Sequence, residues 1–274
     1  MTEHHFDTLR PVELYVEIGR GSVQVSAVDT TESRVELSGR DADRVRIDQD
    51  DHRLSVVAPH ARGGFLSGDS RLDVRVVVPL ESSLAVRTGS ADIDVDGGVA
   101  SAQLRSGSGG VRLGTLSGPG LVETGSGDVH VGRAGGELRI KSGSGGVTVD
   151  HSEAALSVST GSGDVAIGTA ASPSIVKTGS GDLSVAESLT DVTLTTGSGD
   201  LVITAARRGR VSAKGASGDV RVGVPAGLPV WTDVSTVSGS IRSDVESAGE
   251  PQDGQDHLEV RARTVSGDVL LTRA

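Results

Sequence analysis

An eighteen-residue repeat constrains the fold of this chain more than any other feature of its sequence. A Ser/Thr-Gly-Ser-small-Asp/Gly block recurs, and its last position falls at Asp92, Gly110, Asp128, Gly146, Asp164, Asp182 and Asp200. Less regular copies end at Asp219, Ser240 and Asp268, and residues 19–25 (GRGSVQV) look like an early copy. Repeats of this length indicate stacked coils, because one copy alone cannot bury its apolar face.

Each block is flanked by two short strand patterns. An apolar-x-apolar pair such as Val165/Ile167 follows the block, and a second pair such as Leu156/Val158 precedes it. Alternation with period two in β-branched residues is typical of a half-buried strand. We therefore expect an all-β fold, an elongated β-solenoid (β-helix-like) with about 18 residues and two short strands per coil.

The same pattern divides the chain into three continuous parts. Residues 1–83 are expected to form irregular β-strands and a cap, residues 84–204 seven regular coils, and residues 205–274 degenerate coils with a second cap. Caps are needed because an open sheet edge invites association with other chains.

The interior of such coils is expected to be thin. The chain has only four aromatic residues, all outside the regular coils: Phe6, Tyr15, Phe65 and Trp231. Two facing layers of aliphatic side chains leave no room for rings and form no deep cavity, so the fold favours surface binding over a small-molecule pocket.

Charge and composition exclude several classes of function. The formal charge of −11 disfavours nucleic-acid binding, which depends on clustered Lys and Arg. The absence of cysteine excludes disulfides and thiolate metal sites. Because no signal sequence and no apolar run of about 18 residues occur, we expect no membrane insertion and a cytoplasmic location. An extracellular location would need export by an unrecognised route.

Several sequence segments together resemble a known family. The TGSGDV-type repeats, the VVVPL segment and the VPAGLPV…TVSGS segment are similar to the bacterial putative-adhesin β-strand repeat family, domain of unknown function 4097. The resemblance covers nearly the whole chain, and its motifs are structural. It implies a β-solenoid with an adhesin-like role and brings no catalytic residue and no cofactor.

The repeated aspartates suggest a cation site. Asp164, Asp182 and Asp200 lie on consecutive coils, where their carboxylates could bind cations between rungs. Gly110 and Gly146 occupy the same column, however, and a tight turn tolerates Asp and Gly alike. The opposite turn also lacks the repeated acid of calcium-binding β-rolls. Turn chemistry is therefore the favoured interpretation, and we expect no metal.

A correlation within the turns has two open explanations. Ser106 and Ser142 accompany Gly four residues on, whereas Asp occupies that position after Thr88, Thr124, Thr160, Thr178 and Thr196. A Thr–Asp hydrogen bond across the turn would explain this pairing, and so would duplication of a two-coil unit.

A stripe of basic residues also shares one outward phase: Arg87, Arg105, Lys141 and Lys177. Arg207, Arg208 and Arg210 lie nearby in the sequence AARRGR. This set could bind an anionic polymer or a partner's acidic face. A solvated face is the favoured interpretation, because Glu123, Ser159 and Thr195 interrupt the stripe.

The sequence favours binding over chemistry. It contains no HExxH motif and no nucleophile elbow, so we expect no enzyme and no catalytic residue. We predict a binding or scaffold module, a monomer or small oligomer, with an unknown protein partner. Large side chains often anchor interfaces, which makes Trp231, Tyr15 and Phe65 the candidate contacts unless they plug the ends of the core. The alternative function is a self-assembling element that stacks end to end like bacterial β-helical cytoskeletal filaments.

Overall fold

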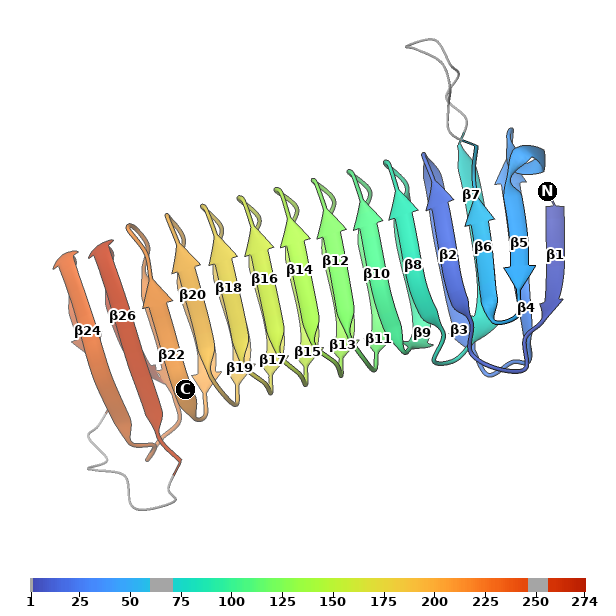
Figure 1. Cartoon of the computed structure of the whole chain (residues 1–274). Helices are drawn as coiled ribbons and strands as arrows, with labels where there is room; N and C mark the ends of the chain where they lie inside the picture. Colours follow the sequence, from blue (N-terminus) through green and yellow to red (C-terminus); the bar gives the residue numbers. More distant parts are fainter. Residues whose placement is uncertain (1, 60–70, 246–255) are drawn as a thin grey trace, which may run out of the picture. The chain divides into compact units, whose positions relative to one another are not determined.

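The computed structural model describes residues 2–59, 71–245 and 256–274, and in these residues the regular structure is β-strand apart from one short turn of helix (Figure 1). That turn is the 3-10 helix η1, Ala42–Arg44. The all-β prediction is confirmed. In the described part of the chain, no helix is long and apolar enough to cross a membrane. The residues group into two compact units, 1–137 and 138–274.

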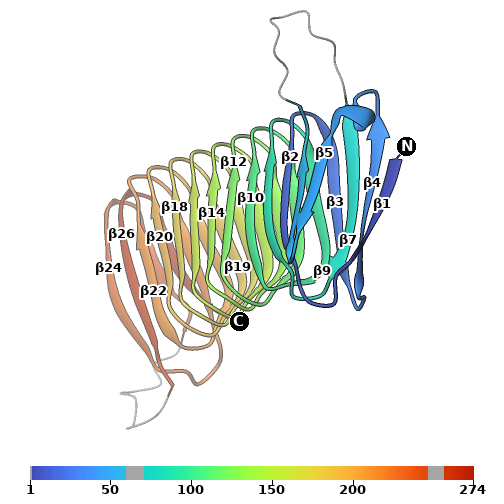
Figure 2. The ribbon, with the colours of Figure 1, turned by 45° about the vertical axis from the view of Figure 1, so that its right-hand side comes forward.

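Residues 1–137 form two stacks of strands, several of which are labelled in Figure 2. One stack runs β1-β4-β7-β3-β9-β11-β13 and the other β12-β10-β8-β2-β6-β5. From β8 onward, parallel neighbours pair eighteen residues apart, as Val86 does with Leu104. The strands are β1 (Thr2–Asp7), β2 (Glu13–Ile18), β3 (Gly21–Val28), β4 (Glu32–Gly39), β5 (Arg46–Asp50), β6 (Arg53–Val57), β7 (Leu72–Pro79), β8 (Ser83–Thr88), β9 (Asp92–Val99), β10 (Ser101–Ser106), β11 (Val111–Leu116), β12 (Gly120–Thr124) and β13 (Val129–Ala134).

The first strands of this unit do not follow chain order. The coil made by β2 and β3 lies between the coil of β6 and β7 and that of β8 and β9, since β2 pairs with both β6 and β8. Three further strands, β1, β4 and β5, pair antiparallel with their neighbours. Residues 19–25, which look like an early repeat in the sequence, stack directly on the first regular coil through Val23 and Ile93.

Residues 138–274 form two further stacks of parallel strands, β15-β17-β19-β21-β23-β27-β25 and β24-β26-β22-β20-β18-β16-β14. The regular part again pairs eighteen residues apart, as in Val158 with Val176. The strands are β14 (Leu138–Ser142), β15 (Val147–Ser152), β16 (Leu156–Thr160), β17 (Val165–Ala170), β18 (Ser174–Thr178), β19 (Leu183–Ser188), β20 (Val192–Thr196), β21 (Leu201–Ala206), β22 (Gly209–Lys214), β23 (Val220–Val224), β24 (Val230–Ser238), β25 (Ile241–Ser243), β26 (Leu258–Ser266) and β27 (Val269–Arg273).

The last two coils of this unit are also exchanged relative to chain order. β26 and β27 come last in the sequence, yet β26 lies between β22 and β24, and β27 lies between β23 and β25. β24 therefore ends its sheet among the described strands, with β26 as its neighbour.

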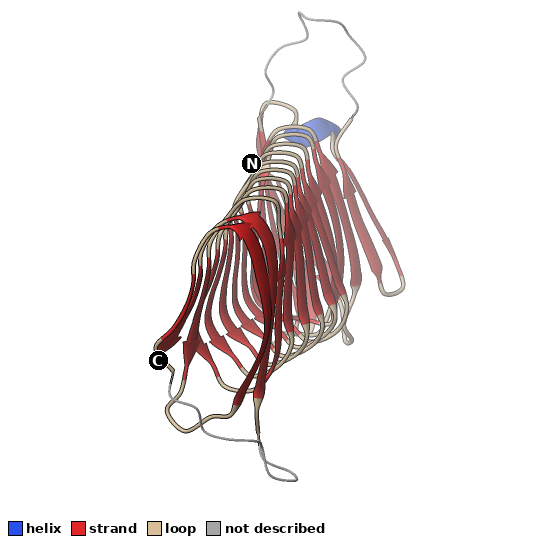
Figure 3. Cartoon of the chain, turned by 90° about the vertical axis from the view of Figure 1, so that its left-hand side faces the viewer, coloured by secondary structure: helices blue, strands red, loops and turns tan. Residues whose placement is uncertain are grey.

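The core of residues 138–274 lies between the two layers of strands seen in Figure 3. Inward positions such as Val158 and Ile167 are at most 2% exposed. A third inward position, five residues into the strands of one sheet, holds small residues such as Ser152, Ala170 and Ser188. The hydroxyls of Ser152 and Ser188 donate to carbonyls two residues on, which compensates for burying them. Among the described residues, the buried apolar side chains include no aromatic ring.

The turns of neighbouring coils stack backbone on backbone. A Cβ placed on Gly163 would lie 2.1 Å from the carbonyl oxygen of Gly145, and one on Gly181 would lie 2.0 Å from that of Gly163. No side chain fits at such a separation. The second glycine of each TGSGD block is therefore required by the close approach of the turns.

Candidate functional site

The aspartates of the repeat form a hydrogen-bonded ladder along the turns of residues 138–274. The backbone N–H of Asp182 donates to Oδ1 of Asp164 at 2.9 Å, and the N–H of Asp200 donates to Oδ1 of Asp182 at 2.7 Å. The ladder continues in the same way. The N–H of Asp219 donates to Oδ1 of Asp200 at 2.7 Å, that of Asp268 to Oδ1 of Asp219 at 2.8 Å, and that of Ser240 to Oδ1 of Asp268 at 2.7 Å. The exchanged strand order is visible here, because Asp268 lies between Asp219 and Ser240. The amide and hydroxyl of Ser240 hold the pKa of Asp268 below its usual range.

This ladder gives the aspartates a structural task. In each of Asp164, Asp182 and Asp200, one carboxylate oxygen accepts an amide hydrogen from the next coil. In residues 2–59, 71–245 and 256–274, no group of three His, Asp or Glu side chains is arranged to hold a metal ion. These hydrogen bonds join successive coils, eighteen or nineteen residues apart, and the preference for turn chemistry over cation binding stays a prediction.

The Thr–Asp hydrogen bond considered for the turns is replaced by a different contact. The hydroxyls of Thr160 and Thr178 accept the N–H groups of Gly163 and Gly181, at 3.0 and 2.8 Å. Ser106 does the same with the N–H of Gly109 at 2.8 Å, in a turn that carries Gly in place of Asp. Thr and Ser thus close the same turn whichever residue follows. Duplication of a two-coil unit stays a prediction.

The arginines that could form an anion site are engaged by neighbouring groups. Arg105 Nε lies 2.9 Å from Glu123 Oε2, and Arg207 Nε lies 2.7 Å from Glu187 Oε1. Arg208 Nε donates to a backbone carbonyl at 2.9 Å. Of these three, only Arg105 belongs to the basic stripe, and the interpretation of the stripe as a solvated face stays a prediction.

Trp231 lies on the outer surface of β24 and is 52% exposed. The guanidinium carbon of Arg261, on the adjacent strand β26, is 5.5 Å from the centre of the indole ring, which is a cation–π distance. Glu259 accepts a hydrogen bond from Arg261 Nε at 2.6 Å and also pairs with Arg210. These bonds, that from Arg210 foremost, lower the pKa of Glu259. Because the ring faces outward, Trp231 does not plug the end of the core.

The other two candidate anchors differ in what the structure says of them. Tyr15 lies on β2 and is partly exposed, and its hydroxyl donates to Glu17. That hydrogen bond, with a smaller effect of burial, raises the pKa of Tyr15. Phe65 lies outside the described residues.

Sequence reasoning missed further exposed apolar side chains on β24, β25 and β26. Val237 is 82% exposed at the end of β24, and Val265 is 55% exposed on β26, its neighbour. The signal was present in the sequence, since TVSG at 236–239 and 264–267 replaces the usual TGSG. Ile241, at the start of β25, is 54% exposed.

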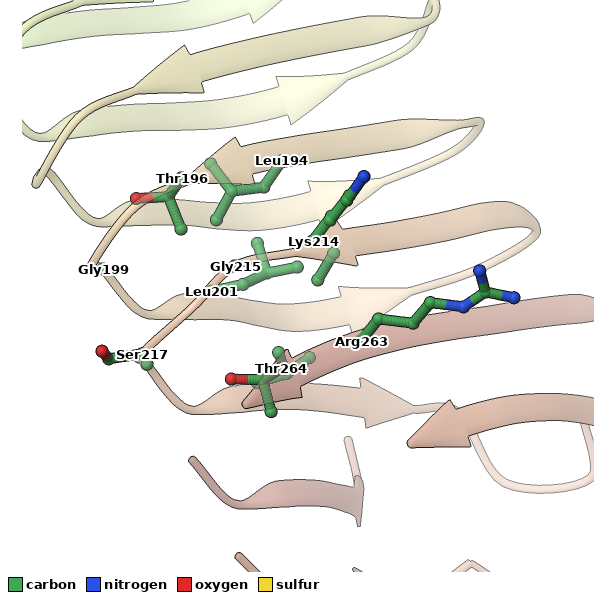
Figure 4. A pocket seen from close by; sticks show the side chains of 12 residues that line it. Leu194, Thr196, Gly199, Leu201, Lys214, Gly215, Ser217, Arg263 and Thr264 are labelled. Carbon is green, nitrogen blue, oxygen red and sulfur yellow. The ribbon is translucent and has the colours of Figure 1, made fainter. Parts of the chain in front are cut away.

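A small cavity lies where a degenerate coil departs from the repeat (Figure 4). Lys214 pairs with Thr195, so Gly215 takes the turn position that Thr196 holds one coil earlier. Ala213 likewise takes the inward position of Leu194. These missing side chains leave a space of about 240 Å³, open mouth included, whose enclosed part fits about one water molecule.

The cavity also contains an unpaired hydroxyl. Thr196 Oγ1 is buried and has no hydrogen-bond partner, because the N–H of Gly199 donates instead to the carbonyl of Ser217 at 3.1 Å. Lys214 and Arg263 extend away from this hydroxyl in Figure 4. The cavity is therefore a local packing defect with space for water, too small for an organic ligand.

A family model matches most of the chain. A sequence model of the family described as Toastrack DUF4097 matches residues 22–272. None of the curated proteins compared with the chain matches it.

Solved structures resemble the chain at low identity. A putative adhesin from Parabacteroides distasonis is 15% identical with a TM-score of 0.40, and one from Bacteroides fragilis is 10% identical with a TM-score of 0.38. Both comparisons cover 98% of this chain and 96% of the other. A structure described as a putative lipid binding protein, also from Parabacteroides distasonis, is 11% identical with a TM-score of 0.35, over 97% of this chain and 96% of that one.

Proposed function

Because this chain belongs to the Toastrack DUF4097 family, we propose that it is a non-catalytic binding module whose partner is another protein. In this proposal the chain is a solenoid of eighteen-residue coils. The coils are regular over residues 84–204 and are flanked by residues 1–83 and 205–274. The partner engages a flank of the solenoid, not the TGSGD turns.

The exposed ring of Trp231 carries this proposal. A half-exposed indole leaves a large apolar area in contact with water, and such side chains are common energetic centres of interfaces. Arg261 and Glu259 hold the ring against β26, so little side-chain entropy remains to be lost when a partner covers it. The Asp ladder, by contrast, already uses one oxygen of each carboxylate within the fold.

The test is capture from native lysate with the wild-type chain and two variants. Trp231→Ala removes the anchor, whereas Ile175→Ala truncates a matched outward side chain, 45% exposed, on β18 of the same sheet. With the captured partner purified, we expect Trp231→Ala to weaken binding by about 2 kcal/mol, roughly 30-fold in Kd, and Ile175→Ala to leave it unchanged.

Hydrogen exchange then locates the contact. We expect partner-dependent protection in 230–235 and 258–263, around Trp231. Protection confined to residues 88–203 would refute a contact at the flanks, and equal binding by wild type and Trp231→Ala would refute the role of the indole.

A second candidate function, self-assembly, is favoured by the position of β24. Among the described strands β24 has a neighbour on one side, so a row of amides and carbonyls is open to another chain. Electron microscopy of the purified chain across a concentration series separates this function from a monomeric binding module.

A further inference from the structure

We propose that two copies of this chain pair through β24, edge to edge and antiparallel, with Val234 of each copy on the two-fold axis. The inference rests on the edge of β24 that no other described strand pairs with, and on a pattern in its residues. It names a second copy as the occupant and does not depend on the proposed protein partner.

The backbone of β24 has hydrogen-bonding groups to offer. The N–H of Leu258 on β26 donates to the carbonyl of Pro229 at 2.9 Å. Because backbone groups alternate in direction along a strand, the even-numbered residues Val230, Thr232 and Val234 direct theirs to the open edge. Unpaired groups of this kind are a template for strand addition.

The inward side chains at this edge are poorly covered. Thr232 is exposed and Val234 is half-buried, whereas their neighbours on β26, Val260 and Ala262, are fully buried. A strand added beyond β24 would cover these positions. In two paired strands, directly opposite residues direct their side chains to the same face of the sheet. The added strand must therefore place its inward residues opposite the inward residues of β24.

The sequence of β24 is complementary to itself in one antiparallel register. With Val234 opposite Val234, Thr232 faces Thr236 and Trp231 faces Val237 of the second copy. The pair of Trp231 and Val237 lies on the outward face and joins an indole that is 52% exposed to a valine that is 82% exposed. Aromatic–β-branched pairs and Thr–Thr pairs both stabilise sheets. In this register inward residues meet inward residues throughout.

One of the two neighbouring registers is disfavoured by charge. A shift centred on Asp233 would place that carboxylate directly opposite its own copy, and like charges in that position are destabilising. In the proposed register Asp233 faces Ser235. Arg263 Nη2, 3.5 Å from Asp233, also offsets this charge within each chain. The placement of the single acid in β24 thus disfavours the register centred on Asp233, whereas the Trp231–Val237 and Thr232–Thr236 pairs favour the one centred on Val234.

The assembly is expected to close as a dimer and not to grow into a filament. Pairing about a two-fold axis uses the β24 edge of both copies. In residues 1–137 the edge strands β1 and β5 carry charges that oppose edge pairing: Glu3 and Asp7 on β1, and Arg46, Asp48 and Asp50 on β5.

Cysteine cross-linking tests the register, because the natural chain has no cysteine. Asp233 and Ser235 are directly opposite across the proposed axis, at a non-hydrogen-bonded pair with Cα atoms about 4.5 Å apart, within disulfide range. Differently tagged Asp233→Cys and Ser235→Cys chains are mixed and oxidised. We expect the heterodimer to cross-link faster than either variant alone by about tenfold. Thr195→Cys, an exposed outward position on β20, serves as the control and should not cross-link.

Sedimentation equilibrium tests closure and the role of the edge. Wild type should approach twice the monomer mass and stop there. Val234→Pro removes an amide that faces the open edge and no bond to β26, so it should weaken dimerisation at least tenfold without unfolding the chain. A strictly monomeric wild type, cross-linking fastest in a single variant, or masses beyond the dimer would each overturn the proposal. A monomer that still captures a partner through Trp231 refutes the dimer and leaves the proposed function intact.

Discussion

The carboxylate of Asp164 accepts the backbone N–H of Asp182 at 2.9 Å, although the two residues are eighteen positions apart. The next residue in the chain, Val165, points inward and is 1% exposed. Two adjacent residues therefore have opposite tasks, since one ties successive turns together at the surface and the other fills the core.

Substitutions at these two positions should differ greatly in cost. Val165→Asp buries an unpaired charge between the sheets and is expected to lower the free energy of unfolding by more than about 4 kcal/mol. Asp164→Gly leaves the Asp182 amide to water and should cost about 1 kcal/mol. Urea denaturation measures both, and equal midpoints would contradict the assignment of inward and outward phase.

Calcium should not stabilise the chain. A ligand that binds the native state raises the melting temperature by mass action, but in the ladder of Asp164, Asp182 and Asp200 one oxygen of each carboxylate accepts a backbone amide. We expect the same melting temperature in calcium and in chelator. A calcium-dependent rise of several degrees would favour a cation column instead.

The stacked turns predict that alanine is not tolerated at Gly181. A Cβ there would lie 2.0 Å from the carbonyl oxygen of Gly163, so Gly181→Ala should cost more than about 2 kcal/mol. The matched control is Gly19→Ala, where no atom lies within 4 Å of the added Cβ, and its effect should stay within about 1 kcal/mol. Thermal unfolding compares the two, and a harmless Gly181→Ala would mean that the turns are spaced more widely.

Two threonines at the same turn position should respond differently to valine. Thr178 accepts the buried N–H of Gly181 at 2.8 Å, and Thr178→Val leaves that amide unsatisfied at a cost of about 1–3 kcal/mol. Thr196 has no such partner, so Thr196→Val should change stability by less than about 0.5 kcal/mol. Chemical denaturation gives both values. Equal losses would show that water completes the bonding of Thr196.

The N-terminal strand should be stabilised at acidic pH through His5. A hydrogen bond to Glu32, with smaller charge effects from Glu32 and Glu3, raises the pKa of His5 above 6.5. The contribution of the protonated ring is therefore complete below pH 6.5 and is lost as the pH rises through the raised pKa. The difference in melting temperature between wild type and His5→Gln should be larger at about pH 5.5 than at about pH 8.5. A difference that grows with pH would refute this ion pair.

Local sequence patterns predicted the strands and turns of the repeat, because they depend on neighbouring residues. The phase of Val165 and the turn at Asp164 follow from spacing alone. The exchanged order of β24 and β26 could not be predicted in this way, because both strands end in TVSG and have similar patterns. Which of them lies beside β22 depends on contacts between segments far apart in the chain.

The candidate site was predictable only in part. Trp231 is conspicuous in a chain with four aromatics. Its outward direction, however, depends on the register between β24 and β26, which places Trp231 opposite Glu259. The cavity at Gly215 follows from a one-residue insertion: Thr195 pairs with Lys214, nineteen positions on. An alignment with a fixed period of eighteen conceals this insertion, so the replacement of Thr by Gly is not apparent.

The exchanged coils also impose an order on synthesis and assembly. β24 and β25 leave the ribosome before β26 and β27, yet among the described strands they pair with those later strands. While the nascent chain is being made, residues 230–243 therefore lack their native neighbours and cannot extend the growing stack. In a nascent chain arrested after residue 245, the coil of β24 and β25 has been made but cannot dock, because the coil of β26 and β27 is still absent. In a chain arrested within the regular repeat, each completed coil already has the preceding coil to dock on.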